Sequence, residues 1–410
     1  MTSALLRVVS ARNAVAFSFL LNGFAFASWI SRIPETRDTL GLGNAGLGLL
    51  LLCLSAGSLA ALPSAGALVS RFGAAGVVRF GTSADGAGLL AIALGAGVVQ
   101  SVWLTGVGLF CYGVGTGVWD VAMNVEGADV ERRLGRTIMP RFHAAFSLGT
   151  VLGAAAGALT VLLGVGMRWH LPLVAVVMVA ASLLTVGRFL PVETSSPAAP
   201  EARGGAWLEP RTLLIGLMVL ALALTEGTAN DWLAVALQDG YDVARWLAVL
   251  GFGGFVAAMT LGRLVGPALL DRHGRVPVLW ATMTSAGAGV LLIVLGGTPW
   301  LVVPGIVLWG LGASLGFPVG MSAAADDRVR AAARVSVVST IGYTAFLAGP
   351  PLLGFVGDQV GTLNALLVVS VLLVPAALVV PVAREPRRVS DRRRGPTAGR
   401  RPPGWRTWPG

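Results

Sequence analysis

The chain has 410 residues, of which 55% are apolar and only 12% are charged, and its formal net charge is +10. A water-soluble domain carries about 25% charged residues, so this composition excludes an ordinary soluble globular protein. The sequence contains no lysine, which excludes a phosphate-binding loop of the G-x-x-x-x-G-K-[ST] type and with it the use of ATP by this chain.

Twelve apolar runs follow one another, and each can cross the ~30 Å hydrocarbon core that about 20 helical residues span. They cover residues 11–31, 44–69, 76–98, 101–124, 142–165, 170–190, 211–236, 245–270, 276–297, 300–322, 333–356 and 361–382. The runs are continuous rather than alternating, which excludes a β-barrel. The 56 glycines are expected to let membrane helices pack closely. The sequence therefore predicts an all-α integral membrane protein with twelve transmembrane helices.

The arginines indicate the orientation of these spans. With both chain ends in the cytoplasm, only four arginines in loops or at span ends remain outside: Arg32, Arg37, Arg168 and Arg245. Positive charge retained in the cytoplasm sets topology, so we expect an N-in/C-in, multi-pass protein of a bacterial inner membrane. Six tryptophans near the outer span ends are expected to form an interfacial belt: Trp29, Trp103, Trp169, Trp232, Trp246 and Trp300.

The first run also has to be tested as a cleaved signal peptide, because Ala25-Phe26-Ala27 is a passable cleavage site. Eleven further runs follow it, which favours a first transmembrane span. Asn22, midway along this run, is an isolated polar residue and a candidate for contact with a solute. Asp85, near the inner end of the third run, is interpreted as a packing contact.

The fourth run carries Asp120 and Asn124, which share a helix face at a spacing of four. One interpretation places this pair in a solute pathway, and the other has it anchor the cytoplasmic end of the helix. His143 begins the fifth run, where it serves either as a helix-end hydrogen-bonding group or as a proton relay.

Glu226 lies about fifteen residues, or roughly 22 Å, into the seventh run. An acidic residue at the centre of a membrane span costs about 2.5–3.5 kcal/mol to insert, so a cavity, a cation or protonation has to offset it. Desolvation favours the protonated form, and Glu226 with Asn230 on the same face is a candidate solute and proton-coupling site. The alternative is a glutamate that only bonds to neighbouring helices. Arg263 in the eighth run is expected to pair with an acidic neighbour.

Two segments between and after these runs have no apolar face. Residues 191–210 contain four prolines and predict a cytoplasmic linker. The tail 384–410, rich in Arg and Pro, is expected to be disordered and to meet anionic lipid headgroups rather than nucleic acid. The resulting domains are 1–190 and 211–383, each a six-helix half, joined by the linker and followed by the tail.

The two halves repeat the same markers at a nearly constant offset. Trp103, Gly113-Val114-Gly115 and Ala128-Asp129 recur 197 residues later. Arg71 and Gly73 recur 201 residues later as Arg272 and Gly274. Paired membrane-embedded halves are how many secondary transporters build a site that can face either side of the membrane.

The loops after the second and eighth runs carry a recognisable pattern. Arg71-Phe72-Gly73 and Asp271-Arg272-His273-Gly274-Arg275 resemble the G-x-x-x-D-R-x-G-R loop of the major facilitator superfamily over residues 1–383. The first copy has Ser70 and Ala74 in place of the Asp and the last Arg. The resemblance implies conformational gating by Arg71, Gly73, Asp271, Arg272, Gly274 and Arg275, with Asp271 and Arg272 the better candidates for a charge lock.

A finer resemblance lies in Asp120-Val121-Ala122-Met123-Asn124, in Arg141 to Gly149, and in Glu226-Gly227 with Asp231-Trp232. These segments are similar to the fucose-permease-like sugar/proton symporters and their uncharacterised bacterial relatives. Those permeases carry an acidic residue at the position of Thr116. The resemblance therefore implies their fold more strongly than their substrate.

The sequence therefore predicts a secondary transporter, not an enzyme, that moves a small polar, sugar-like solute by proton-coupled symport. The alternatives are proton-driven efflux of a small molecule or drug, and a non-transporting receptor or scaffold of the same fold. We expect a monomer with no cofactor and no metal, driven by the proton gradient, because the histidines and cysteines have no metal-ligand spacing.

Overall fold

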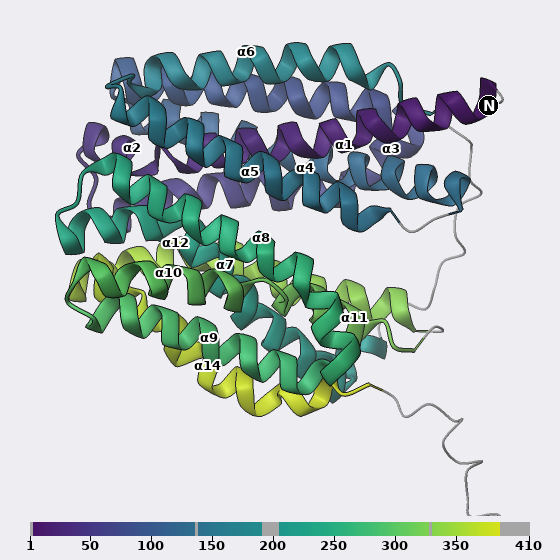
Figure 1. The fold of residues 1–410 in the computed structure, drawn as a ribbon. Coiled ribbons are helices and arrows are strands. Elements are labelled where there is room, and N and C mark those ends of the chain that lie inside the picture. The colour runs from purple at the N-terminus through teal and green to yellow at the C-terminus, as the bar shows by residue number, and fades with distance from the viewer. Residues whose placement is uncertain (1–2, 136–137, 191–204, 328–329, 386–410) are drawn as a thin grey trace, which may run out of the picture.

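The computed structural model describes residues 3–135, 138–190, 205–327 and 330–385, and every regular element in these ranges is a helix (Figure 1). The first half consists of α1 (Ser3–Ile30), α2 (Ile33–Leu40), α3 (Asn44–Leu94), η1 (Gly95–Val99), α4 (Val102–Leu134), α5 (Met139–Leu162) and α6 (Met167–Val186). The second consists of η2 (Gly205–Leu208), α7 (Pro210–Tyr241), α8 (Arg245–His273), α9 (Arg275–Leu295), α10 (Pro299–Ala313), α11 (Gly316–Ala324), α12 (Ala331–Val360), α13 (Thr362–Ala365), α14 (Leu367–Val379) and η3 (Val380–Ala383).

Eleven helical segments in the described ranges are long and apolar enough to cross a membrane. One of them, Asn44–Val99, has 56 residues, or about 84 Å at 1.5 Å per residue, far more than one crossing needs. Gly73 interrupts it with φ 72° and ψ 160°, a conformation that only glycine adopts readily. This segment thus contains the second and third of the expected runs, divided at the predicted loop glycine.

Gly274 has nearly the same backbone conformation as Gly73, with φ 76° and ψ 172°, and it separates α8 from α9. The two loop glycines that the repeat pairs at an offset of 201 therefore turn the chain in the same way. The repeat is present in the backbone as well as in the sequence.

Two elements were not expected from the apolar runs. The short helix α2 follows α1 directly and ends at Gly41, a left-handed C-cap with φ 61°. The tenth run is not one helix, because the chain leaves the helical path at Ser314-Leu315, between α10 and α11.

The two halves lie together at one end and separate toward the other (Figure 1). Helices α1–α6 form one group and α7–α14 the other, and the main contacts between groups are α3 with α12 and α5 with α8. The halves are close at the end that carries α2, and they diverge toward the end that carries the N-terminus and α11. The end with α2 is called the outer end below, and the opposite end the inner end.

Small residues bring helices into close contact, as expected. A Cβ added at Gly149 or Gly153 of α5 would collide with the backbone oxygen of Leu20 or Phe24 of α1. Backbones this close exclude any larger residue at the contact. Glycine thus sets the spacing of α1 and α5.

The predicted tryptophan belt is wrong for two of its six members. Trp29 and Trp232 are 0% and 1% exposed, whereas Trp103 and Trp300 are each 87% exposed. Position along a helix places a tryptophan at a membrane depth, but the face of the helix decides whether it points to lipid or to the core. Trp29 and Trp232 point into the core.

Candidate functional site

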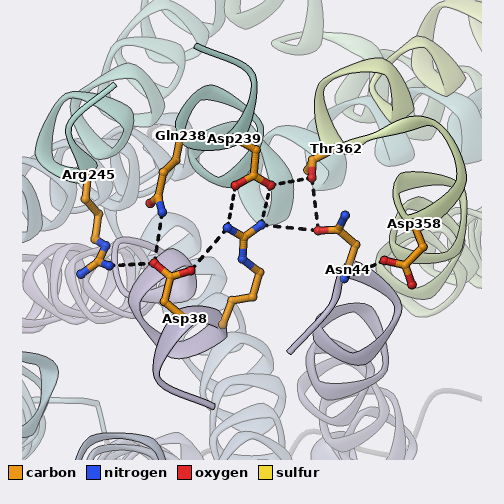
Figure 2. A network of polar contacts seen from close by, with 8 residues as sticks. Asp38, Asn44, Gln238, Asp239, Arg245, Asp358 and Thr362 are labelled. Atoms are coloured by element: carbon orange, nitrogen blue, oxygen red, sulfur yellow. Dashed lines mark hydrogen bonds and ion pairs between the residues drawn. The ribbon is translucent and has the colours of Figure 1, made fainter. Parts of the chain in front are cut away.

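A network of charged and polar side chains joins the halves at the outer end (Figure 2). Its centre is the pair of Arg37, from α2, and Asp239, near the end of α7. Arg37 Nη1 donates to Asp239 Oδ2 at 2.5 Å, and Nη2 donates to Oδ1 at 2.6 Å. Two parallel hydrogen bonds between a guanidinium and a carboxylate give a strong and geometrically specific contact.

A second pair of opposite polarity lies beside the first. Arg245 Nη2, at the start of α8, donates to Asp38 Oδ2 at 2.7 Å, and Gln238 Nε2 donates to the same oxygen at 3.1 Å. The first half therefore supplies a cation and an anion in sequence, and the second half supplies their partners (Figure 2).

The network continues to the contact between α12 and α3. Asp358, near the end of α12, accepts the backbone N–H groups of Asn44 and Ala45 at 2.9 and 3.2 Å. These are free donors at the first turn of α3, where the helix dipole favours a negative charge. Thr362 donates to Asp239 at 2.7 Å, which links this cap to the central pair.

A buried cluster supports the outer end of the first half. Arg32, only 1% exposed, donates through Nε to His170 Nδ1 at 2.9 Å, through Nη1 to Glu35 at 2.5 Å and through Nη2 to Thr160 at 2.7 Å. Glu35 also accepts the backbone N–H of Met167, at the start of α6. The cluster ties the start of α2 to α5 and α6.

Within the described residues, the hydrogen bonds and ion pairs that join the halves all lie at the outer end. Charged groups at the inner end bind within their own half instead. Asp326 pairs with Arg275 and with Arg211, each at 2.8 Å, and so connects α9, the start of α7 and the end of α11.

Only some of the predicted gating residues form contacts in this structure. Arg275 is paired, and Gly73 and Gly274 shape their loops. Arg71 stacks on its neighbour Phe72. Asp271 and Arg272 are exposed, and neither makes an ion pair with another described residue. The charge lock that the resemblance implies for them is therefore not formed in this state, in which the outer end is the closed one.

The equivalent of Asp326 in the first half behaves differently. Asp129 pairs with Arg132 and Arg133 of its own helix, at 2.8 and 2.9 Å. The position that corresponds to Arg275 holds Ala74, which offers no charge to Asp129. Asp129 is thus bonded within its own helix, whereas Asp326 connects segments of three helices.

Glu226 is paired with a cation, one of the three ways expected to offset its charge. Arg263 Nη2 of α8 donates to the two carboxylate oxygens of Glu226 at 3.0 and 3.2 Å. The side chains are 19% and 29% exposed, so the pair is only partly withdrawn from solvent. Arg263 is also within electrostatic range of His143 of α5, across the contact between halves. The expected acidic partner of Arg263 is Glu226.

Asp120 and Asn124 lie together on α4, as their spacing predicts. Asn124 Nδ2 donates to the backbone oxygen of Asp120 at 2.8 Å and to its Oδ1 at 3.2 Å. Asp120 is within electrostatic range of Tyr343 in the other half.

Tyr343 belongs to a row of three aromatic rings. Its ring centroid lies 5.9 Å from that of Phe317 and 6.4 Å from that of Phe346. The ring of Phe346 lies against Gly227 of α7, next to Glu226. The row therefore runs from α11 to the helix that carries the acidic candidate.

The two remaining candidates have unused hydrogen-bonding capacity. Asn22 is 4% exposed, and its Nδ2 has no hydrogen-bond partner among the described residues. Asn230, half-buried on α7, likewise has no partner there. The structure does not bring Asn22 into a bonded group with Asp120 or Glu226.

Sequence reasoning missed the outer network. Arg37 and Arg245 entered only as arginines outside the membrane, and Asp38, Asp239 and Asp358 were not considered. Opposite charges at the outer ends of corresponding spans were an available signal, since Arg37 and Asp239 are 202 residues apart.

A sequence model of the Major Facilitator Superfamily matches residues 15–326 and 241–409. The chain is 34% identical over 369 residues to an uncharacterised transporter of Sinorhizobium fredii, which covers 89% of this chain and 96% of the relative. It is 31% identical over 374 residues to an uncharacterised transporter of Yersinia pestis named as a member of the same superfamily, covering 88% and 94%.

Solved structures give the same fold. A crystal structure of the nucleoside transporter NupG superposes with a TM-score of 0.76 at 14% identity, covering 91% of this chain and 99% of that one. A bacterial homologue of the human lysosomal transporter Spinster, in an inward-facing and unoccupied conformation, superposes with a TM-score of 0.72 at 13% identity, covering 92% and 97%.

Proposed function

This chain belongs to the major facilitator superfamily and is a multi-pass membrane transporter, and on that premise we propose that it carries a small polar, sugar-like solute by proton-coupled alternating access. The proposal includes twelve membrane crossings, with Asn44–Val99 counted as two, and both chain ends in the cytoplasm. On this topology the outer end faces away from the cytoplasm, and the solute pathway of the present state opens inward.

The observation that carries the proposal is the one-sided connection between the halves. The ion pairs between halves, Arg37–Asp239 and Arg245–Asp38, lie at the outer end, while the helices diverge at the inner end (Figure 1). A carrier that works by rocking two halves is expected to have such a state, closed on one side and open on the other. The fold likeness to an inward-facing structure agrees with this interpretation.

The groups that the halves present to each other support this solute class. Asp120 and Asn124 offer hydrogen-bonding groups from α4, and Tyr343 offers a hydroxyl from α12. The aromatic row provides ring faces beside them. Hydroxyl-rich rings such as sugars, or the ribose of a nucleoside, combine the two kinds of surface that this arrangement complements.

Coupling is assigned to the pair of Glu226 and Arg263. Protonation of Glu226 removes its charge and frees the guanidinium of Arg263, which lies near His143 at the contact between α5 and α8. A change of charge at this contact alters the energy of the interface on which the halves rock. Solute binding and proton binding thereby act on the same conformational equilibrium.

Glu226→Gln tests the assignment, because the amide keeps the shape of the side chain and cannot titrate. Thermal stabilisation of the purified protein against sugars, nucleosides, amino acids and drugs first identifies a ligand. In proteoliposomes, Glu226→Gln should then abolish accumulation driven by a proton gradient and keep exchange of labelled for unlabelled ligand. Asp242→Asn, which changes an exposed acid at the C-terminal end of the same helix, is the matched control and should keep both activities. Accumulation that survives Glu226→Gln would show that coupling lies elsewhere.

A further inference from the structure

Asp85 is a buried acid that the proposed function does not use. It lies in the part of α3 that follows Gly73 and is 1% exposed. The hydroxyl of Thr116 on α4 lies 3.2 Å from one carboxylate oxygen and 3.3 Å from the other. A Cβ at Gly115 would collide with Asp85 Oδ1, so the carboxyl is enclosed by the backbone of α4.

The surroundings of Asp85 contain no cation to balance a negative charge. Within the described residues it forms no ion pair, and Thr116 is its only hydrogen-bonding side chain. The titratable group near it on α4 is Tyr112, which is neutral at physiological pH. From α6, the other helix packed on this part of α3, the contacts come from Ser182 and Val179. An ionised carboxylate is costly in such a place unless it is paired.

Thr116 connects this buried carboxyl to a partly exposed face of α4. Thr116, Asp120 and Asn124 lie at spacings of four on one face of α4, and all three are partly exposed. About 6 Å along the helix separates Thr116 from Asp120. A threonine hydroxyl can donate to a carboxylate and can also accept from a carboxylic acid, so it serves both protonation states of Asp85.

We propose that Asp85 is a proton-binding site, loaded and unloaded through the hydroxyl of Thr116 from the face of α4 that carries Asp120. The proton resides on a carboxylate oxygen of Asp85, and Thr116 reverses its hydrogen bond when the proton leaves. Asp85 differs from Glu226 in having no cation beside it. Arg263 forms an ion pair with Glu226, whereas Asp85 forms none with any described residue. This second proton site extends the proposed coupling, and it rests on that function for its role in transport.

Infrared difference spectroscopy of the full-length protein in lipid tests the proposal without a known substrate. A protonated carboxylic acid gives a carbonyl stretch separated from the amide bands, and the stretch shifts in heavy water. We expect the wild-type protein to show such a band, with an amplitude that decreases from mildly acidic to mildly alkaline pH. Asp85→Asn should remove one component of this band. Asp38→Asn, which changes an acid paired with Arg245, should leave it intact.

Thr116→Val provides a readout that does not require Asp85→Asn to fold. Without the hydroxyl, the carbonyl of Asp85 loses a hydrogen bond, so its band should move to higher frequency and exchange more slowly with heavy water. The proposal is overturned if Asp85→Asn removes no band, or if the Asp85 band has a constant amplitude at every pH at which the protein stays folded. Glu226→Gln should not alter the band, so failure of the Glu226 assignment and failure of this site are distinguishable.

Discussion

Removing the guanidinium of Arg37 should open the outer end of the protein. Arg37 and Asp239 share two hydrogen bonds, and their side chains are 12% and 29% exposed. A hydrogen bond to a charged group contributes about 1.5–3 kcal/mol and an exposed ion pair about 0.2–1 kcal/mol, so we assign about 1–2 kcal/mol to this partly exposed pair. Since 1.4 kcal/mol is a tenfold change, Arg37→Ala should lower the closed-to-open ratio about five- to thirtyfold.

A single cysteine reports the opening. Asn230 lies nine residues before Asp239 on α7, about 13 Å deeper along the helix. In a protein with Cys53 and Cys111 replaced by Ala, Asn230→Cys can be labelled from outside by an impermeant maleimide only when the outer end opens. The labelling rate should rise by the same five- to thirtyfold factor in Arg37→Ala.

The matched control is Arg132→Ala, which removes an arginine that pairs with Asp129 inside one helix. It should leave the labelling rate unchanged. The double variant Arg37→Ala, Asp239→Ala should label little faster than Arg37→Ala alone, because the two changes remove the same interaction. An unchanged rate in Arg37→Ala, with folding intact, would refute the idea that this pair holds the outer end closed.

Two further predictions concern stability. Gly73→Ala and Gly274→Ala should each lower the free energy of unfolding by about 1–3 kcal/mol, because a Cβ strains a backbone with φ near 75°. The melting temperature should therefore drop in both variants. It should stay constant in the control Gly66→Ala, where the added Cβ meets no neighbour. The hydrogen bond from Arg334 holds the pKa of Glu209 below its usual value, so Glu209 contributes stability above its unfolded pKa of about 4.3 and loses it as the pH falls through the lower folded pKa. The melting temperature should therefore fall more steeply on acidification below about pH 4.3 in the wild type than in Glu209→Gln, and equal slopes would contradict this linkage.

Much of the helical framework could be predicted because membrane spans and loop glycines are local features. An apolar run of sufficient length predicts a helix by itself, and Gly73 and Gly274 indicate the turns at which neighbouring spans separate. The broken helix at Ser314-Leu315 could not be predicted, because the surrounding residues are as apolar as those of an unbroken span.

The candidate site was only partly accessible from sequence for a different reason. The i, i+4 spacing of Asp120 and Asn124 fixes their contact within one helix. The pairs Arg37–Asp239 and Glu226–Arg263 depend instead on how separate helices align, and one sequence does not contain that alignment. Asp85 was interpreted as a packing contact because nothing near it in the sequence shows that its neighbours in space are uncharged.

The two ion pairs of the outer network form a latch to which each half contributes both signs of charge. Arg37 and Asp38 come from one half and Arg245 and Asp239 from the other. The second half adds a further negative group, Asp358, which binds the backbone N–H groups of Asn44 and Ala45. Arg37 already lies 3.4 Å from Asp38, so a released Arg37 has an anion on its own helix. After separation Arg37 keeps Asp38 beside it, whereas Asp358 loses the backbone N–H groups of Asn44 and Ala45. Because each cation faces an anion of the other half, the two pairs together fix the register in which the halves meet.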